Sequence, residues 1–463
     1  MKRKIYRIAR VPIVFAAVLL FLSAGSAGAA IDGISGTSFN LTAKVDRIST
    51  ADGGSILLWG YTVGARAQYP GPTLIVNEGD TVTVQLTNSL IVSGGGAVPN
   101  VSIVFPGQEV TVLGSDPGVA GLLTSEAAPA DGTVTYQFTA TNPGTYMYHS
   151  GTRPELQVEL GLLGALIVRP SGFPANYAYN HPDSRFDREY LFLLSEMDPR
   201  IHETVAFFGP DATQLQDSDY LSDYFSNYWF INGRTAPDDM AEPDVFWLPT
   251  QPYNIVPRMH PGERLLMRVI GGNRDMHPFH HHGNHARIIA RDGRLLESAP
   301  GRGADLSPEV FTINSIPGET VDAIFEWTGQ GLNWDIYGSE LDDPMYAHNC
   351  IDLVNNETGL APPDGFADAA SDFPYEYCGD HTKQFPVTLP EKQDLAFGGW
   401  YGGSPFLGTA GTLPPGEGGL NPNGGFSYMW HSHTEKELTN YDIFPGGMLT
   451  MLIIEAPGVE IIE

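Results

Sequence analysis

Cysteine is scarce in this sequence: its 463 residues contain only Cys350 and Cys378. Two cysteines are too few for a four-cysteine zinc site. Because neither lies in a CxxC motif, the sequence also excludes a dithiol redox motif. An even pair of cysteines in an oxidising compartment normally forms a disulfide. We therefore predict a Cys350–Cys378 disulfide that closes a long loop.

Basic residues are also few. There are 25 Lys and Arg against 54 Asp and Glu, which gives a formal net charge of −29. Such a surface repels nucleic acid and anionic lipid, and it concentrates cations near the protein. The charge therefore excludes nucleic acid as a partner, although solubility alone is a sufficient reason for it.

Long apolar runs are missing after the first thirty residues. Residues 1–29 combine a basic start, an apolar run from Val11 to Leu22 and a small-residue end at Ala27–Gly28–Ala29. This pattern is typical of a secretory signal peptide and is too short for a membrane span. We expect a mature chain without a transmembrane span, secreted to the periplasm, the cell surface or the medium.

Long amphipathic helices are likewise not evident, whereas segments with the residue pattern of β-strands are frequent. Residues 72–88, 133–150 and 164–170 are rich in Val, Thr and Tyr and are bounded by Gly, Pro and Asn. With 53 Gly and 36 Pro, the chain has the composition of an all-β sandwich protein with many turns.

The distribution of these strand-like segments suggests how the chain is divided into domains. We predict a first β domain at 30–170, a linker at 171–187 and a second β domain at 188–463. The second domain contains an insertion at about 335–425, rich in Gly, Pro and acidic residues. Because structureless loops of that length are unusual, we expect the insertion to have some structure of its own.

Histidines are concentrated in two short stretches. Five of the 13 lie in "HPFHHHGNH", residues 277–285, and two more form the HxH of "MWHSHTEKE", residues 429–437. On a strand, residues i and i+2 share a face, so His280 pairs with His282, and His431 with His433. Four neutral imidazoles brought together this way would suit copper or zinc.

The isolated histidines have a simpler interpretation, as surface or structural residues. These are His181, His202, His260, His348 and His381.

Four stretches resemble the motifs of the multicopper oxidase family. They are "YPGPTLIVNEGDTVTVQLTN" (69–88), "PGTYMYHSGTRPELQVELGLLGALIV" (143–168), "PGERLLMRVIGGNRDMHPFHHHGNH" (261–285) with its HPxHxHG signature, and "YMWHSHTEKELTNYDIFPGGM" (428–448). The resemblance implies two cupredoxin-like Greek-key β-sandwich domains. It is nearest to a bacterial cell-surface branch related to manganese-oxidising multicopper proteins.

The resemblance also implies a set of copper ligands. His280 falls at the type 2 position, His282 and His431 at one type 3 copper, and His149 and His433 at the other. Three further ligands of the family pattern are replaced by Ser102, Val104 and Gly151. Five of eight cluster histidines therefore remain, and we expect one or two copper ions in an altered site.

The type 1 position departs further from the family. His277 matches its first histidine, but Ser432 stands where the family has its cysteine and Glu437 where it has the second histidine. A blue copper site needs the thiolate, so we expect no blue copper. His277, His281 and His285 remain as further candidate ligands. Asp275, Glu435 and Glu437 are candidates for carboxylates that accept a hydrogen bond from the second nitrogen of a ligand imidazole.

Three functions are compatible with these residues. The first is oxidation of a small reductant, such as a metal ion, with O₂ as acceptor at a non-blue copper. The second is a degenerate module that binds metal without turnover. The third is a subunit of a cell-surface assembly, as a homotrimer or with a heteromeric partner; only a different chain could supply the three missing histidines.

Overall fold

The computed structural model describes residues 31–92, 96–216, 223–356, 358–373, 375–385, 403–406, 425–455 and 459–461. Within these ranges the chain is mostly β-strand with few helices, which confirms the predicted all-β class. The predicted signal peptide lies outside the described residues. No helix in the described part has the length and apolar character needed to cross a bilayer.

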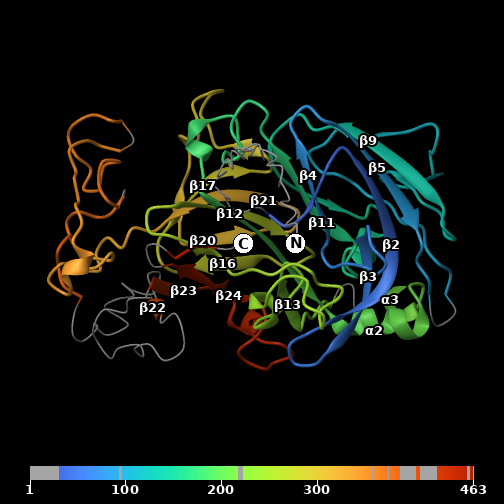
Figure 1. Cartoon of the computed structure of the whole chain (residues 1–463). Helices are drawn as coiled ribbons and strands as arrows, with labels where there is room; N and C mark the ends of the chain where they lie inside the picture. Colours follow the sequence, from blue (N-terminus) through green and yellow to red (C-terminus); the bar gives the residue numbers. More distant parts are fainter. Residues whose placement is uncertain are drawn as a thin grey trace, which may run out of the picture.

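The first β-sandwich, blue to cyan in Figure 1, is built from residues 34–169. One sheet has the order β1-β4-β11-β10, with bounds β1 (Ile34–Ser35), β4 (Gly71–Asn77), β11 (Leu163–Arg169) and β10 (Gly144–His149). The facing sheet has the order β3-β2-β5-β9-β6, with bounds β3 (Ser55–Thr62), β2 (Ser38–Ser49), β5 (Thr81–Asn88), β9 (Thr133–Thr139) and β6 (Thr111–Val112). A short ribbon pairs β7 (Val119–Ala120) with β8 (Ser125–Glu126).

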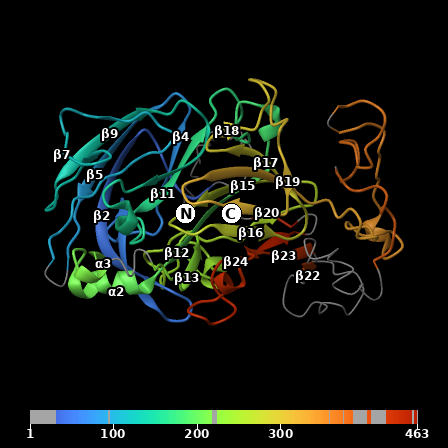
Figure 2. The ribbon, with the colours of Figure 1, turned by 180° about the vertical axis from the view of Figure 1, so that it is seen from behind.

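The second sandwich is built from residues 188–454 and lies beside the first in both views (Figures 1 and 2). One sheet contains β13 (Tyr228–Ile231), β12 (Arg188–Met197), β15 (Arg264–Gly271), β21 (Thr320–Glu326), β17 (Ala286–Arg291) and β18 (Arg294–Leu295), with β19 (Glu309–Val310) paired to β17. The other contains β14 (Arg258–Met259), β24 (Leu449–Ile454), β23 (Gly425–Ser432), β16 (His277–His281) and β20 (Thr312–Ser315), with β22 (Gly403–Phe406) paired to β23.

The longest helix is one that the sequence analysis did not expect. The described helices are α1 (Pro154–Gln157), α2 (Pro199–Phe208), α3 (Thr213–Gln216) and the 3₁₀ turns η1 (Pro182–Ser184), η2 (Asp238–Met240), η3 (Pro344–Tyr346) and η4 (Glu435–Leu438). Asp198 caps α2 by accepting a hydrogen bond from the Arg200 amide, and Pro199 occupies its first turn. An Asp-Pro pair of this kind is a helix-start signal that the sequence does contain.

Strand β12 explains how the two sandwiches are joined. Its residues from Leu191 to Met197 are all buried, because Phe192 and Leu194 face the core of the second sandwich while Leu191 and Leu193 face an apolar layer shared with the first. A strand covered on both faces has a continuous apolar run rather than alternation. The shared layer makes the sandwiches one packed body.

A buried ionic network crosses the same junction. Arg268 on β15 is fully buried; its Nε donates to Glu189 at 2.9 Å and its Nη1 donates to Thr145 of the first sandwich at 2.9 Å. Asp322 accepts from Thr145 at 2.6 Å, and Arg169 pairs with the same Glu189. Charges this deep are tolerated only when they are paired, so each partner depends on the others.

The insertion stands at the far side of the second sandwich from the first (orange in Figures 1 and 2). Its described residues between 335 and 385 are mostly turns, with η3 and one isolated bridge between Phe366 and Tyr377. The predicted disulfide is confirmed: Cys350 and Cys378 are bonded, with their Cα atoms 5.7 Å apart.

Replacement of Arg268 tests the junction network. We expect Arg268→Met to lower the free energy of unfolding by about 3–5 kcal/mol, because Asp322 would be left buried without its cation and Glu189 would keep only Arg169. Urea unfolding followed by tryptophan fluorescence measures this change. The matched control is Arg66→Met, whose partner Asp46 lies 2.6 Å away in a half-exposed pair and should be worth about 0–1 kcal/mol. Equal losses in the two variants would contradict the assigned role.

Candidate metal centre

The histidine cluster is assembled by one pair of antiparallel strands. Strands β16 and β23 align Phe279 with Ser432, His280 with His431, and His281 with Trp430. Because side chains alternate along a strand, His280 and His431 point to one face, while their neighbours point into the core. The two HxH motifs, about 150 positions apart, thus meet on one face of the sheet.

Three imidazoles form the centre of the cluster. Ring nitrogens of His280, His282 and His431 lie within 4.8 Å of one another. The Nε2 atoms of His282 and His431 are 3.3 Å apart, a distance that suits a shared proton or two ligands of one metal ion. The ring of His280 lies 4.7 Å from that of His282 and 5.5 Å from that of His431.

Hydrogen bonds orient two of these rings. The Nδ1 of His280 lies 2.9 Å from the Thr312 hydroxyl on β20, and the Nδ1 of His431 donates to the Ser432 carbonyl at 2.6 Å. A carbonyl only accepts, so the proton of His431 is on Nδ1 and its Nε2 lone pair faces the cluster. Metal-binding histidines are typically held in this way through their other nitrogen.

The cluster favours uncharged imidazoles. Burial, and then the neighbouring histidines, lower the pKa of His280 to about 4. Burial also lowers the pKa of His431 to about 4, against the hydrogen bond to Ser432 that raises it. Neutral imidazole is the form that binds a metal ion, so the rings are ready as ligands at neutral pH.

His433 lies at the solvent side of the cluster. Its ring is 5.0 Å from that of His280 and 5.6 Å from that of His431. Its side chain is 56% exposed, and its Nδ1 lies 3.8 Å from the carboxylate of Glu435, which is 85% exposed. Of the predicted outer carboxylates, Glu435 is therefore beside the cluster at its open side.

The two additional histidines of the run lie elsewhere. His281 is fully buried and packs against Phe325 and Trp430 in the core, with Nε2 3.0 Å from the Val310 carbonyl. His285 packs against Phe311 at the start of β17. Neither belongs to the group of three converging imidazoles among the described residues.

His277 is held between two glutamates. Its Nε2 lies 2.9 Å from Glu196 and its Nδ1 lies 2.9 Å from Glu437, and its side chain is fully buried. Burial alone would lower the pKa of His277, but the hydrogen bonds and charges of the two glutamates raise it to about 10. At neutral pH this residue is therefore an imidazolium with both N–H groups engaged.

Glu196 is a functional partner that the sequence analysis missed. It lies one residue before the end of the apolar strand β12. Its other oxygen accepts the backbone N–H groups of Arg274 and Asp275 at 2.8 and 3.0 Å. A charged residue in an otherwise buried strand was the signal that could have identified it. The Asp275 side chain, a predicted outer carboxylate, instead accepts from Ser226 at 3.3 Å.

The predicted ligand of the first sandwich, His149, is set apart from the three imidazoles. The group of nitrogens within 4.8 Å does not include it among the described residues. Its backbone pairs with Val104, and its Nδ1 donates to the Ser150 carbonyl at 2.9 Å. Burial lowers its pKa, so this imidazole is also neutral.

Beside His149, a packed polar network surrounds Ser102, Val104 and Gly151, the positions at which the resemblance would place histidines. The Ser102 hydroxyl accepts from the Gly151 amide at 3.1 Å and lies 2.8 Å from the Thr152 hydroxyl, which donates to Glu126 at 2.8 Å. A Cβ at Gly151 would lie 2.7 Å from a methyl group of Val104. Ser102, Val104 and Gly151 are therefore fitted to one another.

Comparison with known proteins agrees with this geometry. The sequence profile of the family described as "Multicopper oxidase" matches residues 59–172. An L-ascorbate oxidase from Brassica rapa is 33% identical over 140 residues, which are 30% of this chain and 21% of that protein. Copper resistance protein A from Escherichia coli is 25% identical over 355 residues, 71% of this chain and 50% of that protein. The chain thus spans half or less of the length of these curated relatives.

Solved structures show the same architecture. The blue copper oxidase from Nitrosomonas europaea matches with a TM-score of 0.50 at 19% identity, covering 90% of this chain and 85% of that one. The multicopper oxidase mgLAC matches with a TM-score of 0.50 at 18% identity, covering 94% and 89%. These matches confirm the predicted class, a protein of cupredoxin-like β-sandwich domains. The profile match over residues 59–172 and the curated relatives add a sequence likeness to the multicopper oxidases.

The buried His277 makes stability depend on pH. Its folded pKa of about 10 lies above the ordinary value of about 6.5. The stabilisation is therefore complete below about pH 6.5 and is lost as the pH rises through about 10. We expect urea unfolding to show a larger loss of stability between pH 6 and pH 10 in the wild type than in His277→Gln. Identical losses would contradict a charged His277.

The fit around Gly151 can be tested with a double-mutant cycle. We expect Gly151→Ala to lower the free energy of unfolding by about 1–3 kcal/mol, because its new methyl group overpacks against Val104. In a Val104→Ala background the same change should cost clearly less, since the opposing methyl groups are gone. Equal costs in both backgrounds, measured by urea unfolding, would contradict the proposed contact.

Proposed function

We propose that the chain binds copper at His280, His282 and His431 and oxidises a small reductant with O₂ as the acceptor. The observation that carries this proposal is the convergence of three ring nitrogens within 4.8 Å, on a sheet face of a multicopper oxidase fold. Imidazole nitrogen is a preferred donor for copper.

The residues fit one non-blue copper and do not fit a blue one. Three imidazoles, two of them oriented through Nδ1, form a donor set that leaves coordination positions open. At the type 1 position, Ser432 offers a hydroxyl that accepts from the Thr434 amide at 3.2 Å, and His277 has both nitrogens bound to glutamates. No thiolate is present at that position, so blue copper is not part of the proposal.

A bound copper would supply one-electron redox chemistry and an open position for O₂. Two one-electron donors and two protons convert one O₂ to H₂O₂, which is the balanced reaction expected without the other coppers of the family. The chain's own contribution is to hold three neutral imidazoles and to keep one side of the cluster open at His433 and Glu435, both more than half exposed. A cationic reductant would be attracted by the acidic surface.

A metal-binding module without turnover is the second candidate. The observation that favours it is the Glu196–His277–Glu437 arrangement, which takes the position of the copper that receives electrons in the resembled family. Electrons would then have to reach the cluster directly from a bound reductant. We also propose secretion of the mature chain, which is supported by its Cys350–Cys378 disulfide.

The copper content of the mature protein tests the site first. After Cu(II) loading and desalting, we expect about one tightly held copper per chain by elemental mass spectrometry, and loss of that copper in His280→Ala/His282→Ala. The loaded wild type should consume O₂ with Fe(II), Mn(II) or a phenol as reductant and produce H₂O₂, and the variant should not.

His181→Asn is the matched control, because it removes a remote imidazole but keeps an N-cap acceptor where His181 now accepts from the Asp183 amide. It should retain copper and activity. Copper near zero in the wild type would overturn the proposal, whereas bound copper without O₂ consumption would leave the binding module as the function.

A further inference from the structure

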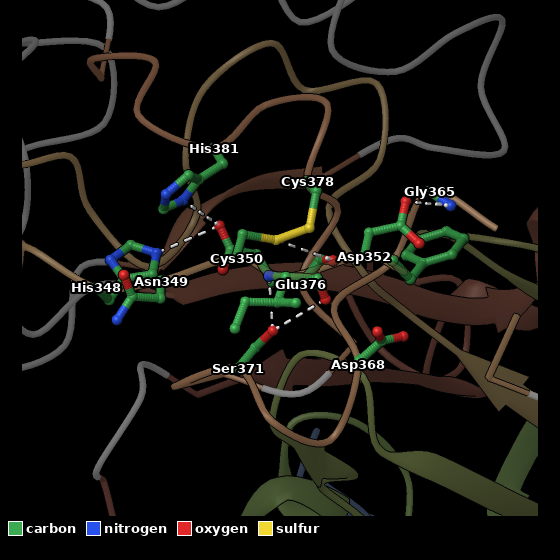
Figure 3. Close-up of a disulfide and its surroundings, with 12 residues drawn as sticks. His348, Asn349, Cys350, Asp352, Gly365, Asp368, Ser371, Glu376, Cys378 and His381 are labelled. Carbon is green, nitrogen blue, oxygen red and sulfur yellow. Dashed lines mark hydrogen bonds and ion pairs between the residues drawn. A yellow bond between two sulfur atoms is a disulfide. The ribbon is translucent and has the colours of Figure 1, made fainter. Parts of the chain in front are cut away.

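A second group of potential ligands lies in the insertion, away from the histidine cluster. Ligand atoms of four residues lie within 4.8 Å of one another: Asp335, His348, Glu376 and His381. Figure 3 shows His348 and His381 turned toward the Glu376 carboxylate, beside the disulfide. Both histidines were interpreted from the sequence as isolated residues, and the fold brings them together.

The distances in this group are those of ligands around one small cation. His348 Nε2 lies 3.2 Å from Glu376 Oε1 and 3.5 Å from Asp335 Oδ2. His381 Nδ1 lies 3.0 Å from the same Glu376 oxygen and 3.4 Å from the same Asp335 oxygen. Tetrahedral zinc with bonds of about 2.0–2.1 Å has ligand atoms about 3.3 Å apart.

Hydrogen bonds to backbone groups outside the cluster orient the ligand side chains. His348 Nδ1 donates to the Tyr346 carbonyl at 2.7 Å, which directs Nε2 toward the carboxylates. Asp335 accepts the backbone N–H groups of Tyr337 and Thr382 at 3.0 and 2.9 Å. Such outer hydrogen bonds are typical of metal-binding histidines and carboxylates.

Three of the four side chains are almost fully buried, and one of their oxygen atoms has no hydrogen-bond partner among the described residues. The side chains of Asp335 and Glu376 are 0% and 2% exposed, and that of His348 is 5% exposed. The second oxygen of Glu376 is buried and has no hydrogen-bond partner. Two carboxylates converge here with two imidazoles, and a divalent cation bound between them would compensate the negative charge of the carboxylates.

We propose that Asp335, His348, Glu376 and His381 form a structural zinc site that, together with the Cys350–Cys378 disulfide, fixes the fold of the insertion. Two nitrogen and two oxygen donors suit Zn²⁺, whereas Ca²⁺ and Mg²⁺ take six or more oxygen ligands including water. The site does not depend on the function proposed for the histidine cluster.

The position of the ligands explains why a metal ion is useful here. The described part of the insertion has few backbone ladders, and its ligands come from three separate segments. A metal ion that joins residues 335, 348 and 376–381 restricts loops that one disulfide leaves open.

Zinc binding is best measured in a chain from which the other cluster has been removed. In His280→Ala/His282→Ala, we expect about one Zn²⁺ per chain by elemental analysis after zinc loading and dialysis. Addition of His381→Ala should remove it. The isosteric change Glu376→Gln should weaken zinc affinity at least about 100-fold, since it alters a ligand rather than an outer partner.

His260→Ala/Glu263→Gln is the matched control, because that pair has one imidazole and one carboxylate 3.4 Å apart without the other two ligands. It should leave zinc content unchanged. Added Zn²⁺ should also raise the thermal midpoint of the His280→Ala/His282→Ala chain, and a chelator should reverse this. An absence of zinc in that chain, or unchanged affinity in Glu376→Gln with its far-UV circular dichroism intact, would overturn the proposal.

Discussion

The register between β16 and β23 is the constraint on which the metal centre depends. Trp430 is fully buried and packs against Phe192, Phe279 and Phe325, so this side of β23 must face the core. A slip of one residue would turn Trp430 toward solvent and His431 into the core. The tryptophan thus fixes the direction of the neighbouring imidazole, and the apolar core rather than a metal ion brings the three histidines together.

The two faces of the same strand pair carry different chemistry. On the outer face, neutral imidazoles meet with lone pairs available. On the inner face, both ring nitrogens of His277 form hydrogen bonds to glutamates, one on β12 and one on η4. A copper ion there would have to displace a proton and break two buried, charge-assisted hydrogen bonds without gaining a thiolate. Ser432 and Glu437 stand where the resemblance would place a cysteine and a histidine. The two residues are consistent with one another, since each suits a site in which His277 is protonated rather than bound to copper.

Features with a sequence period were predictable, whereas pairings between distant side chains were not. Alternation along the strands indicated the all-β class, and the even cysteine count indicated the disulfide. A charge in a buried strand marks Glu196, but no local pattern predicts that its partner is His277, which lies on a different strand 81 positions away. The same holds for the insertion, where His348 and His381 meet only because aperiodic turns bring their segments together.

In the first sandwich, Ser102, Val104 and Gly151, where the resemblance would place histidines, depend on one another through their contacts. Ser102, Thr152 and Glu126 form a hydrogen-bonded chain, and Asn100 donates to the other Glu126 oxygen at 2.9 Å. Glu126 is buried, so one of its oxygens would lose the Thr152 donor if an imidazole displaced the hydroxyls. Val104 meanwhile occupies the space that a side chain at Gly151 would need. This part of the first sandwich is thus stabilised as a packed polar network, and among the described residues the three imidazoles that converge come from the second sandwich.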